Sequence, residues 1–232
     1  MIYRRLPRML QFAPDFLQRH VLHFESEIEL AAKEFARVMP IDARVLDAGA
    51  GEAQYKELFA TARYTAVDLG IGDSGWSYAQ LDAIAALETL PFRTGSFAGC
   101  LNIVTLEHVR EPRVVIAEIA RVLQPGGKLL LITPLEWEEH QQPHDYFRYT
   151  RHGLEYLLQS AGLRIESLRP AGGFFRLLSR RLFNAPQFFP LPIGLLILIL
   201  VTIPALLIPL LDGLDQKRHF TLGHICIAIK PL

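Results

Sequence analysis

The sequence RVLDAGAGE, residues 44–52, reads as a short buried strand that runs directly into a glycine turn. Gly49 and Gly51 allow the backbone to turn tightly and to approach a ligand closely, because glycine has no side chain. A helix is expected to follow over residues 53–61, and its first amide N–H groups would then face that ligand. The stretch therefore predicts a ligand-binding turn at the carboxyl end of a strand.

The same turn departs from the patterns of nucleotide-binding proteins. A dinucleotide fingerprint would have a further glycine at position 54, where this chain has Gln54. Asp47 stands just before the glycines, and its charge is unfavourable beside a pyrophosphate but favourable beside a cation. No Gly-x-x-x-x-Gly-Lys-Ser/Thr sequence is present, so a P-loop is excluded. A dinucleotide oxidoreductase stays a disfavoured alternative.

Strand and helix patterns alternate outward from this turn in both directions. Gly162 is expected to close one helix in the left-handed conformation. This alternation with short glycine turns predicts an α/β open sheet of mostly parallel strands. Helices are expected over residues 25–39, 53–61, 112–123 and 151–161, and strands over 44–48, 64–67, 78–81, 97–104, 128–133, 163–168 and 219–230.

Length and composition narrow the class of protein further. The 232 residues suit one domain with an appendage, and 50% hydrophobic with 21% charged residues excludes a disordered chain. Equal counts of basic and acidic residues, 24 each, argue against a nucleic-acid-binding protein. Two cysteines, Cys100 and Cys226, exclude a disulfide scaffold or a Cys-rich zinc site, fit a reducing compartment, and are expected to be buried apolar filler on separate strands. No signal peptide is expected, since no apolar run of sufficient length follows the first arginines.

Ligands of open α/β sheets bind outside the carboxyl ends of the strands, so residues that end strands are informative. Asp68 ends the second expected strand, about 20 residues after the glycine turn, and its carboxylate can accept hydrogen bonds from two ribose hydroxyls. Asp82 and Thr105 follow later strands. A ligand with a ribose, an adenine and a cationic centre but no phosphate is S-adenosylmethionine.

At this point the chain resembles the class I S-adenosylmethionine-dependent methyltransferases, in the small-molecule branch called type 11. The resemblance covers about residues 40–170 and rests on motifs in a fixed order. It implies a Rossmann-like seven-stranded, mostly parallel sheet with an antiparallel last strand. The motifs are VLDAGAGEAQY (45–55), YTAVDLG (64–70), LDAIAALETLPFRTGSF (81–97), LEHVREP (106–112), EIARVLQPGGKLLLITP (118–134) and AGLRIESL (161–168).

The resemblance also implies a set of cofactor-binding residues. The glycine turn would line the methionine end, Asp68 would hold the ribose, Asp82 and Ala83 would flank the adenine, and residues 105–108 would border the methyl group. One departure is Ala98, where the family usually has Asp. The cofactor-binding residues expected for S-adenosyl-L-methionine are Asp47, Ala48, Gly49, Ala50, Gly51, Asp68, Leu69, Asp82, Ala83 and Thr105.

Candidate catalytic residues follow the fourth and fifth expected strands. Methyl transfer is an in-line displacement, so the protein mainly positions donor and nucleophile, and a hydroxyl nucleophile would also need a base. His108, His144 and Tyr146 are the catalytic candidates, and the loop 140–149 also offers His140, Asp145 and Arg148 for binding or deprotonating an acceptor. The alternative is that 145–148 only caps the helix that follows.

A metal ion is not expected at this strand end. Some quinone-pathway relatives carry Glu-x-x-Glu-His there, whereas Val104 takes the place of the first glutamate in this chain. The sequence therefore predicts no metal among the site residues.

Residues 188–211 carry no charge and are about as long as the ~20 residues that a transmembrane helix requires. Prolines at 190, 192, 204 and 209 interrupt them, and arginines or lysines flank both ends. A single span would leave the last strand on the far side of the membrane and the sheet incomplete. We therefore expect a proline-broken helical hairpin that dips into one leaflet, helped by the basic, aromatic residues 1–22. A dimer interface or a lid over an apolar pocket is the alternative.

Three segments are expected: a basic and aromatic N-terminal helical segment (1–39), a methyltransferase domain (40–175 with 213–232), and a membrane-associating insertion (176–212). The expected function is methyl transfer from S-adenosylmethionine to a small or lipidic acceptor at the membrane surface. The expected location is cytoplasmic, peripheral or monotopic, with a homo-oligomer left open. The alternative is a non-catalytic membrane partner that keeps the methyltransferase fold.

Overall fold

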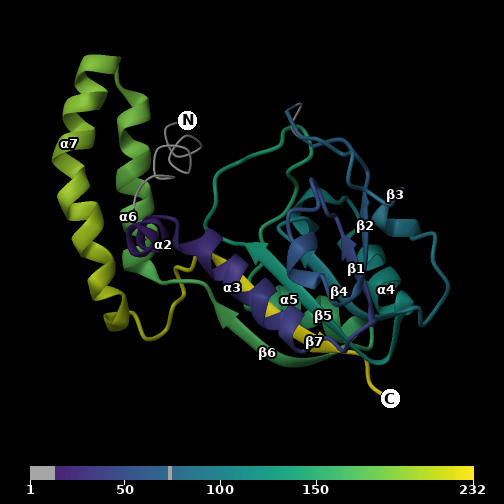
Figure 1. Cartoon of the computed structure of the whole chain (residues 1–232). Helices are drawn as coiled ribbons and strands as arrows, with labels where there is room; N and C mark the ends of the chain where they lie inside the picture. Colours follow the sequence, from purple (N-terminus) through teal and green to yellow (C-terminus); the bar gives the residue numbers. More distant parts are fainter. Residues whose placement is uncertain (1–13, 73–74) are drawn as a thin grey trace. The chain divides into compact units, whose positions relative to one another are not determined.

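The apolar runs of the sequence form seven strands of one sheet, in the order β3-β2-β1-β4-β5-β7-β6 (Figure 1). The computed structural model describes residues 14–72 and 75–232. The strands are β1 (Arg44–Ala48), β2 (Arg63–Asp68), β3 (Ala83–Ile84), β4 (Phe97–Ile103), β5 (Leu123–Pro134), β6 (Arg164–Pro170) and β7 (Gly223–Ile229).

Parallel pairing joins the first five strands. β1 pairs with β2 on one side and β4 on the other, β2 pairs with β3, and β4 with β5. β7 runs antiparallel beside β5, where Lys230 exchanges backbone hydrogen bonds with Gly126 and Gly127 at 2.8 and 2.9 Å. The predicted α/β fold, with a mostly parallel seven-stranded sheet and an antiparallel last strand, is confirmed.

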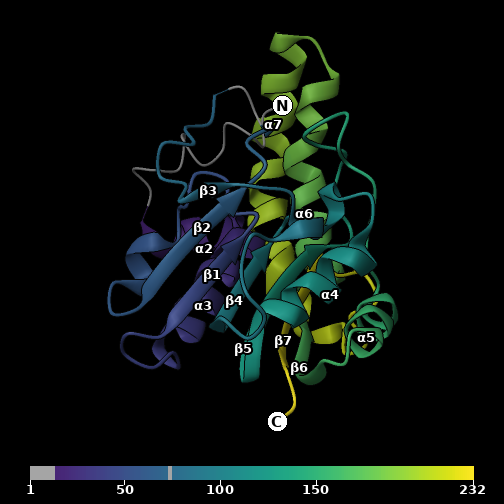
Figure 2. The ribbon, with the colours of Figure 1, turned by 90° about the vertical axis from the view of Figure 1, so that its right-hand side faces the viewer.

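Helices cover both faces of this sheet. The helices α4 (Pro112–Val122) and α5 (Arg151–Ser160) lie side by side (Figure 2) and pack on a core that includes Cys100 of β4. Neighbouring strand residues face opposite ways, and the adjacent Gly99 lies against Phe35 of α3 (His23–Arg37). α3 therefore covers the opposite face. Cys100 and Cys226 are buried free thiols on strands that β5 separates, as predicted.

Two local predictions are wrong. The helix expected over residues 53–61 is only a short 3-10 helix, Lys56–Phe59, because Gly51 and Ala53 both adopt positive φ and interrupt a helical path. The third strand does not lie over residues 78–81 but follows Asp82, as the two-residue strand β3. Asp82 thus begins a strand rather than ending one. Gly162 closes α5 at φ +75°, as predicted.

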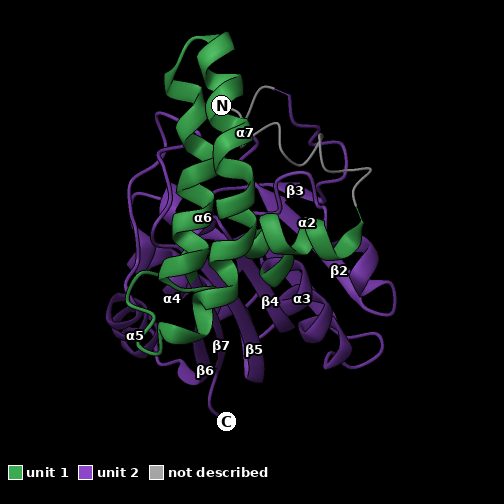
Figure 3. Ribbon diagram, turned by 90° about the vertical axis from the view of Figure 1, so that its left-hand side faces the viewer, with its two compact units in different colours: residues 1–27, 170–223 green, residues 28–169, 224–232 purple. Residues whose placement is uncertain are grey.

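The chain divides into two compact units, coloured separately in Figure 3. One comprises Met1–Glu27 with Pro170–Gly223, and the other comprises Ile28–Arg169 with His224–Leu232. The N-terminal segment expected over residues 1–39 contributes to both units through α2 (Asp15–Val21) and α3. The basic residues at positions 4, 5 and 8 lie outside the described part of the chain.

Within the first unit, α6 (Phe174–Asn184) and α7 (Leu191–Leu207) form a helical hairpin (Figure 3). Ser179 donates a hydrogen bond from its hydroxyl to the carbonyl of Ala205 at 2.5 Å, and Val21, Phe183 and Ala205 form a small apolar core. The expectation that residues 188–211 fold as a proline-broken hairpin by themselves is wrong. Residues 191–207 form the single helix α7 with Pro204 inside it, and the preceding α6 supplies the second arm.

A 3-10 segment, Ile208–Leu214, continues α7 and caps α6. The carboxylate of Asp212 accepts hydrogen bonds from the amides of Gly173 and Arg176, at 3.2 and 3.1 Å. By length and composition, Leu191–Leu214 is the one helix in the described chain that could cross a membrane. Most of its large apolar side chains are exposed, Leu200 by 65% and Ile203 by 66%.

Candidate functional site

The ends of β1, β2 and β4 lie side by side in the sheet, and the glycine turn sits between them. Gly49 has φ +88°, and a Cβ atom there would lie 2.2 Å from Cγ2 of Thr105. The hydroxyl of Thr105 donates hydrogen bonds toward the carbonyl oxygens of Gly49 and Ile103, at 3.1 and 3.0 Å. Because only glycine fits this contact, the turn after β1 and the end of β4 are joined closely.

The backbone amides of the turn donate hydrogen bonds to other groups of the protein. They do not point toward a ligand from the first turn of a helix. Gly49 and Ala50 donate to the carbonyl oxygen of Val67 in β2, at 2.8 and 3.0 Å. Gly51 donates to Oδ2 of Asp68 at 2.9 Å. The expectation of free helix N-terminal amides is therefore wrong, because no α-helix follows the turn.

Asp68 lies at the end of β2 with its carboxylate fixed by two backbone amides. Oδ2 accepts from Gly51, and Oδ1 accepts from Gly70 at 2.8 Å. A carboxylate has about four acceptor positions, so about two remain for a ligand. The next residue, Leu69, is 47% exposed and offers an apolar surface beside that carboxylate.

Asp82 is held against β2 in a reciprocal pair. Its backbone amide donates to the carbonyl of Ala66, and its Oδ2 accepts from the Ala66 amide, at 2.9 and 2.8 Å. Ala83 starts β3 directly after it and pairs with Val67. Asp68 thus ends β2 as predicted, whereas Asp82 lies just before β3 and does not end a strand.

Asp47 lies beneath the turn rather than on its surface. Its side chain is only 1% exposed, and the hydroxyl of Tyr64 donates a hydrogen bond to Oδ2. Burial raises the pKa of Asp47 from 3.8 to about 7, and the Tyr64 hydrogen bond opposes that rise. The neighbouring Ala48 and Ala50 are also buried. The sequence did not indicate Trp76, whose ring lies against Gly51 and Gly72.

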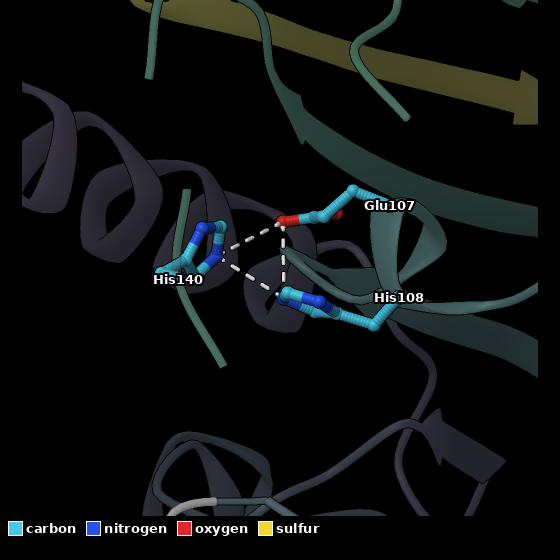
Figure 4. A group of neighbouring side chains, drawn as sticks. All are labelled: Glu107, His108 and His140. Carbon is cyan, nitrogen blue, oxygen red and sulfur yellow. Dashed lines mark hydrogen bonds and ion pairs between the residues drawn. The ribbon is translucent and has the colours of Figure 1, made fainter. Parts of the chain in front are cut away.

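The catalytic candidate His108 ends the 3-10 turn Leu106–His108, after β4, and contacts the loop that follows β5. Its Nδ1 lies 2.7 Å from the carbonyl oxygen of His144, and its Nε2 lies 3.1 Å from Nε2 of His140 (Figure 4). Burial lowers the pKa of His108 and of His140. The fold thus brings together two histidines that are 32 residues apart in sequence.

Glu107 completes this cluster and was not singled out by the sequence. Its side chain is fully buried, and its Oε1 lies 3.7 Å from His108 Nε2 and 3.8 Å from His140 Nε2 (Figure 4). Burial raises the pKa of Glu107 from 4.5 to about 8. The signals in the sequence were the adjacent His108 and the match of Glu107 to the second glutamate of the Glu-x-x-Glu-His pattern.

The loop 138–149 is cross-linked internally by an ion pair and by hydrogen bonds to backbone carbonyls. Arg148 donates to both carboxylate oxygens of Asp145, at 2.6 and 2.7 Å, and the carbonyls of Trp137 and Glu138 accept from the same guanidinium. Although burial opposes it, the Arg148 hydrogen bonds lower the pKa of Asp145 to about 2. This pair braces the loop, which differs from the expected helix cap.

His144 and Tyr146, the other catalytic candidates, lie on the outer side of this loop. The Tyr146 hydroxyl lies 3.1 Å from Nδ1 of His144 and 3.1 Å from Nε of Arg110. The Tyr146 amide donates to the carbonyl of Glu107 at 2.9 Å. The structure thus connects His108 with both candidates, directly to His144 and through Glu107 to Tyr146.

Comparison with known proteins matches the part of this site that lies before residue 132 to a known domain. Residues 46–131 match the family model described as a methyltransferase domain. The chain is 38% identical over 109 residues to a ubiquinone biosynthesis O-methyltransferase of Xanthomonas axonopodis pv. citri (strain 306), covering 42% of this chain and 46% of that protein. It is 32% identical over 101 residues to a malonyl-[acyl-carrier protein] O-methyltransferase of Hahella chejuensis, covering 39% and 36%. The chain thus spans less than half the length of these relatives.

Solved structures share the fold at low sequence identity. A 1,6-didemethyltoxoflavin-N1-methyltransferase of Burkholderia thailandensis, bound to S-adenosylhomocysteine, matches with a TM-score of 0.57 and 18% identity, covering 94% of this chain and 86% of that one. The [4+2]-cyclase SpnF matches with a TM-score of 0.57 and 20% identity, covering 89% and 80%. At this level of identity, these similarities support the fold alone.

Proposed function

Residues 46–131 belong to a class I S-adenosylmethionine-dependent methyltransferase domain, and on this premise we propose that the protein transfers a methyl group from S-adenosylmethionine to a small or lipidic acceptor at a membrane surface. The observation that carries the cofactor assignment is the carboxylate of Asp68, which two backbone amides fix at the end of β2. Its remaining acceptor positions suit the two hydroxyls of a ribose.

The other cofactor contacts follow from the order of the strands. The turn of residues 48–51 would hold the methionine end, because the missing side chain of Gly49 leaves the backbone open to a ligand. Asp82 and Ala83 would flank the adenine, beside the exposed side chain of Leu69. Thr105, whose hydroxyl donates to the Gly49 carbonyl, would border the methyl group.

The protein's part in the reaction is to position donor and acceptor for an in-line displacement at the sulfonium. An acceptor hydroxyl must lose its proton, and an imidazole whose pKa is lowered stays neutral and able to accept one. His108 is the proposed base, with His144 and Tyr146 placed to bind the acceptor at the outer side of the loop. S-adenosylmethionine itself supplies the electrophilic methyl group.

The membrane assignment rests on the α6–α7 hairpin. β6 precedes the hairpin and β7 follows it, and the two strands belong to the same sheet, so both ends of the hairpin stay on one side of a membrane. α6 has 11 residues and a length of roughly 16 Å, too short for a hydrocarbon core of roughly 30 Å. The hairpin therefore enters one leaflet from the cytoplasmic side, with α7 as its apolar arm.

A lipidic acceptor follows from this location, because a membrane-bound catalytic domain meets substrates that reside in the bilayer. The relatives named for ubiquinone biosynthesis and for malonyl-[acyl-carrier protein] are both O-methyltransferases, which supports methyl transfer to an acceptor oxygen. A homo-oligomer formed through α7 is the competing explanation of its exposed apolar surface.

The second candidate function is a membrane partner that keeps the fold without methyl transfer. The similarity in fold to a [4+2]-cyclase is the reason to retain this second candidate, because the same fold can serve chemistries other than methyl transfer. The test is to incubate the protein and methyl-labelled S-adenosylmethionine with a bacterial lipid extract or with a water-soluble metabolite extract. We expect labelled product in the lipid arm. Binding of S-adenosylhomocysteine with no turnover in either arm would favour the partner protein.

A further inference from the structure

Three potential ligand atoms converge beside the proposed cofactor site, on residues from two separate segments. Oε1 of Glu107 and Nε2 of His108 come from the turn after β4, and Nε2 of His140 comes from the loop after β5 (Figure 4). The three separations between these atoms are 3.1, 3.7 and 3.8 Å. The distances are longer than a hydrogen bond for both contacts of the carboxylate.

Glu107 has a buried carboxylate with no hydrogen-bond donor on either oxygen. Its side chain is 0% exposed. Burying a carboxylate is costly unless a cation or several donors stabilise it. The backbone around it is well paired, because the Glu107 carbonyl accepts from the amides of Tyr146 and Phe147. The unsatisfied group is therefore the carboxylate alone.

The two imidazoles are oriented so that their lone pairs face this carboxylate and each other. Nδ1 of His108 lies 2.7 Å from a carbonyl oxygen, which can only accept, so the proton of the neutral ring belongs on Nδ1. Nδ1 of His140 likewise faces the Glu138 carbonyl at 3.2 Å and the Asp145 carboxylate at 3.4 Å. Both Nε2 atoms are then acceptors. Such outer partners fix metal-binding histidines in the same way.

The triangle of acceptors has the dimensions of a metal site. Sides of 3.1, 3.7 and 3.8 Å put the centre of the circle through the three atoms about 2.1 Å from each of them. Zinc bonds to imidazole nitrogen and carboxylate oxygen are roughly 2.0–2.2 Å long. We propose that Glu107, His108 and His140 bind one divalent transition-metal ion, with zinc as the best match.

The choice of ion follows from the donor set. Imidazole nitrogens suit zinc and other late transition metals, whereas magnesium and calcium prefer oxygen ligands. Two histidines and one glutamate are a known ligand set of zinc sites that keep a fourth position open for water or substrate. His140 supplies the third ligand, so the site does not require a carboxylate at Val104.

The alternative is a polar cluster without a metal, in which one imidazole is protonated on Nε2 and donates to the other. That arrangement joins the two histidines but leaves both oxygens of Glu107 without a hydrogen bond. A metal ion satisfies all three groups at once. If the proposed function holds, a metal ion bound here would replace His108 as the group that helps the acceptor hydroxyl to lose its proton, because Nε2 of His108 would then be a ligand and the open position would bind the acceptor oxygen. This role rests on the proposed function, whereas metal binding itself does not.

The experiment uses the whole 232-residue chain, stripped with a chelator and titrated with zinc chloride by calorimetry, with metal content checked by mass spectrometry. We expect one zinc ion per chain. His140→Ala and His108→Ala should each weaken binding by more than ~100-fold, because loss of outer-shell groups alone costs 10- to 100-fold. The control is His152→Ala, whose side chain is 73% exposed on α5 and which should bind zinc as wild type.

Absence of a stoichiometric ion in the wild-type protein, or unchanged zinc affinity in His140→Ala, would overturn the proposal. Circular dichroism of each variant excludes unfolding as the cause of a loss. Replacement of zinc by another divalent transition ion at the same three residues would support the site and reject only the zinc assignment. Titration of the same wild-type sample with S-adenosylhomocysteine keeps failure of this proposal distinct from failure of the proposed function.

Discussion

The carboxylate of Asp68 accepts a hydrogen bond from the backbone amide of Gly51 at 2.9 Å, which ties the end of β2 to the turn after β1. This contact fixes the proposed ribose-binding group relative to the turn that approaches the methionine end. The second hydrogen bond, from Gly70, prevents the carboxylate from rotating away. Asp68 is therefore in place before a ligand arrives, and binding needs little rearrangement there.

Gly49→Ala should destabilise the protein by roughly 3 kcal/mol or more, because the new Cβ would overlap the Thr105 side chain and the backbone would hold an alanine at positive φ. Gly162→Ala is the matched control. It also has positive φ but no atom within 4 Å, so it should cost only about 1 kcal/mol. Urea denaturation measures both. Equal losses would contradict the close contact between Gly49 and Thr105.

Asp47→Asn should change how stability depends on pH. The pKa of Asp47 is raised from 3.8 to about 7 in the folded protein, so the folded state binds its proton more tightly than the unfolded state. The contribution of this group to the free energy of unfolding therefore falls as pH rises from about 4 to 7. Asparagine can still accept the Tyr64 hydrogen bond and removes the titration.

The measurement is urea denaturation of cofactor-free wild type and Asp47→Asn at pH 5 and pH 8. Between these pH values the free energy of unfolding of the wild type should fall by roughly 2–4 kcal/mol more than that of the variant. Contributions from the other titrating groups cancel in this comparison. Parallel curves for the two proteins would show that Asp47 titrates as an ordinary exposed carboxyl.

Arg148→Ala should release the loop that carries His140. The guanidinium holds Asp145, whose carboxylate in turn accepts from the His140 amide at 2.9 Å. Amide hydrogen exchange of residues 138–149 should become roughly 10-fold faster or more. This factor corresponds to the free energy that a hydrogen bond to a charged group contributes to keeping the loop closed. Arg113→Ala, which removes only a surface contact with Tyr156, is the control. Unchanged hydrogen exchange in Arg148→Ala would show that Arg148 does not brace the loop.

Leu200→Asp with Ile203→Asp should reduce binding to liposomes of bacterial lipid in a flotation assay. Both side chains are exposed on α7, and a charge in the hydrocarbon region costs roughly 2.5–3.5 kcal/mol. Ile41→Asp, at an exposed apolar position in the other unit, should float as wild type. Unchanged flotation of the α7 variant, together with a shift from dimer to monomer, would favour the oligomer interface.

The sequence predicted those elements whose signal is local. Strand β1 and helix α5 lie within one residue of their expected bounds, since an apolar run before glycines and a periodic pattern before Gly162 depend on few long-range contacts. The helix after the turn was wrong because Ala53 adopts φ +58°, which its sequence neighbours do not signal. β3 was misplaced because a two-residue strand is formed by its pairing with β2.

The candidate site was predictable only where strand ends define it. Asp68 ends β2 and was identified for that reason, whereas Asp82 was identified as the end of an expected strand over residues 78–81 that the described chain does not form. Glu107 and His140 were not combined, because the loop that carries His140 is placed by Arg148 and by backbone bonds to Glu107 rather than by any spacing in the sequence. A cluster formed between two loops becomes visible only in the folded chain.

The most direct test of the methyltransferase assignment is isothermal titration of the whole 232-residue chain, in detergent, with S-adenosylhomocysteine and with NAD. We predict micromolar binding of S-adenosylhomocysteine and none of NAD. Asp68→Ala should weaken the binding by roughly 10- to 100-fold, because hydrogen bonds to a charged group contribute about 1.5–3 kcal/mol, while Asp42→Ala, at an exposed carboxylate elsewhere, should bind as wild type. Binding of NAD instead, or full affinity in Asp68→Ala, would contradict the account.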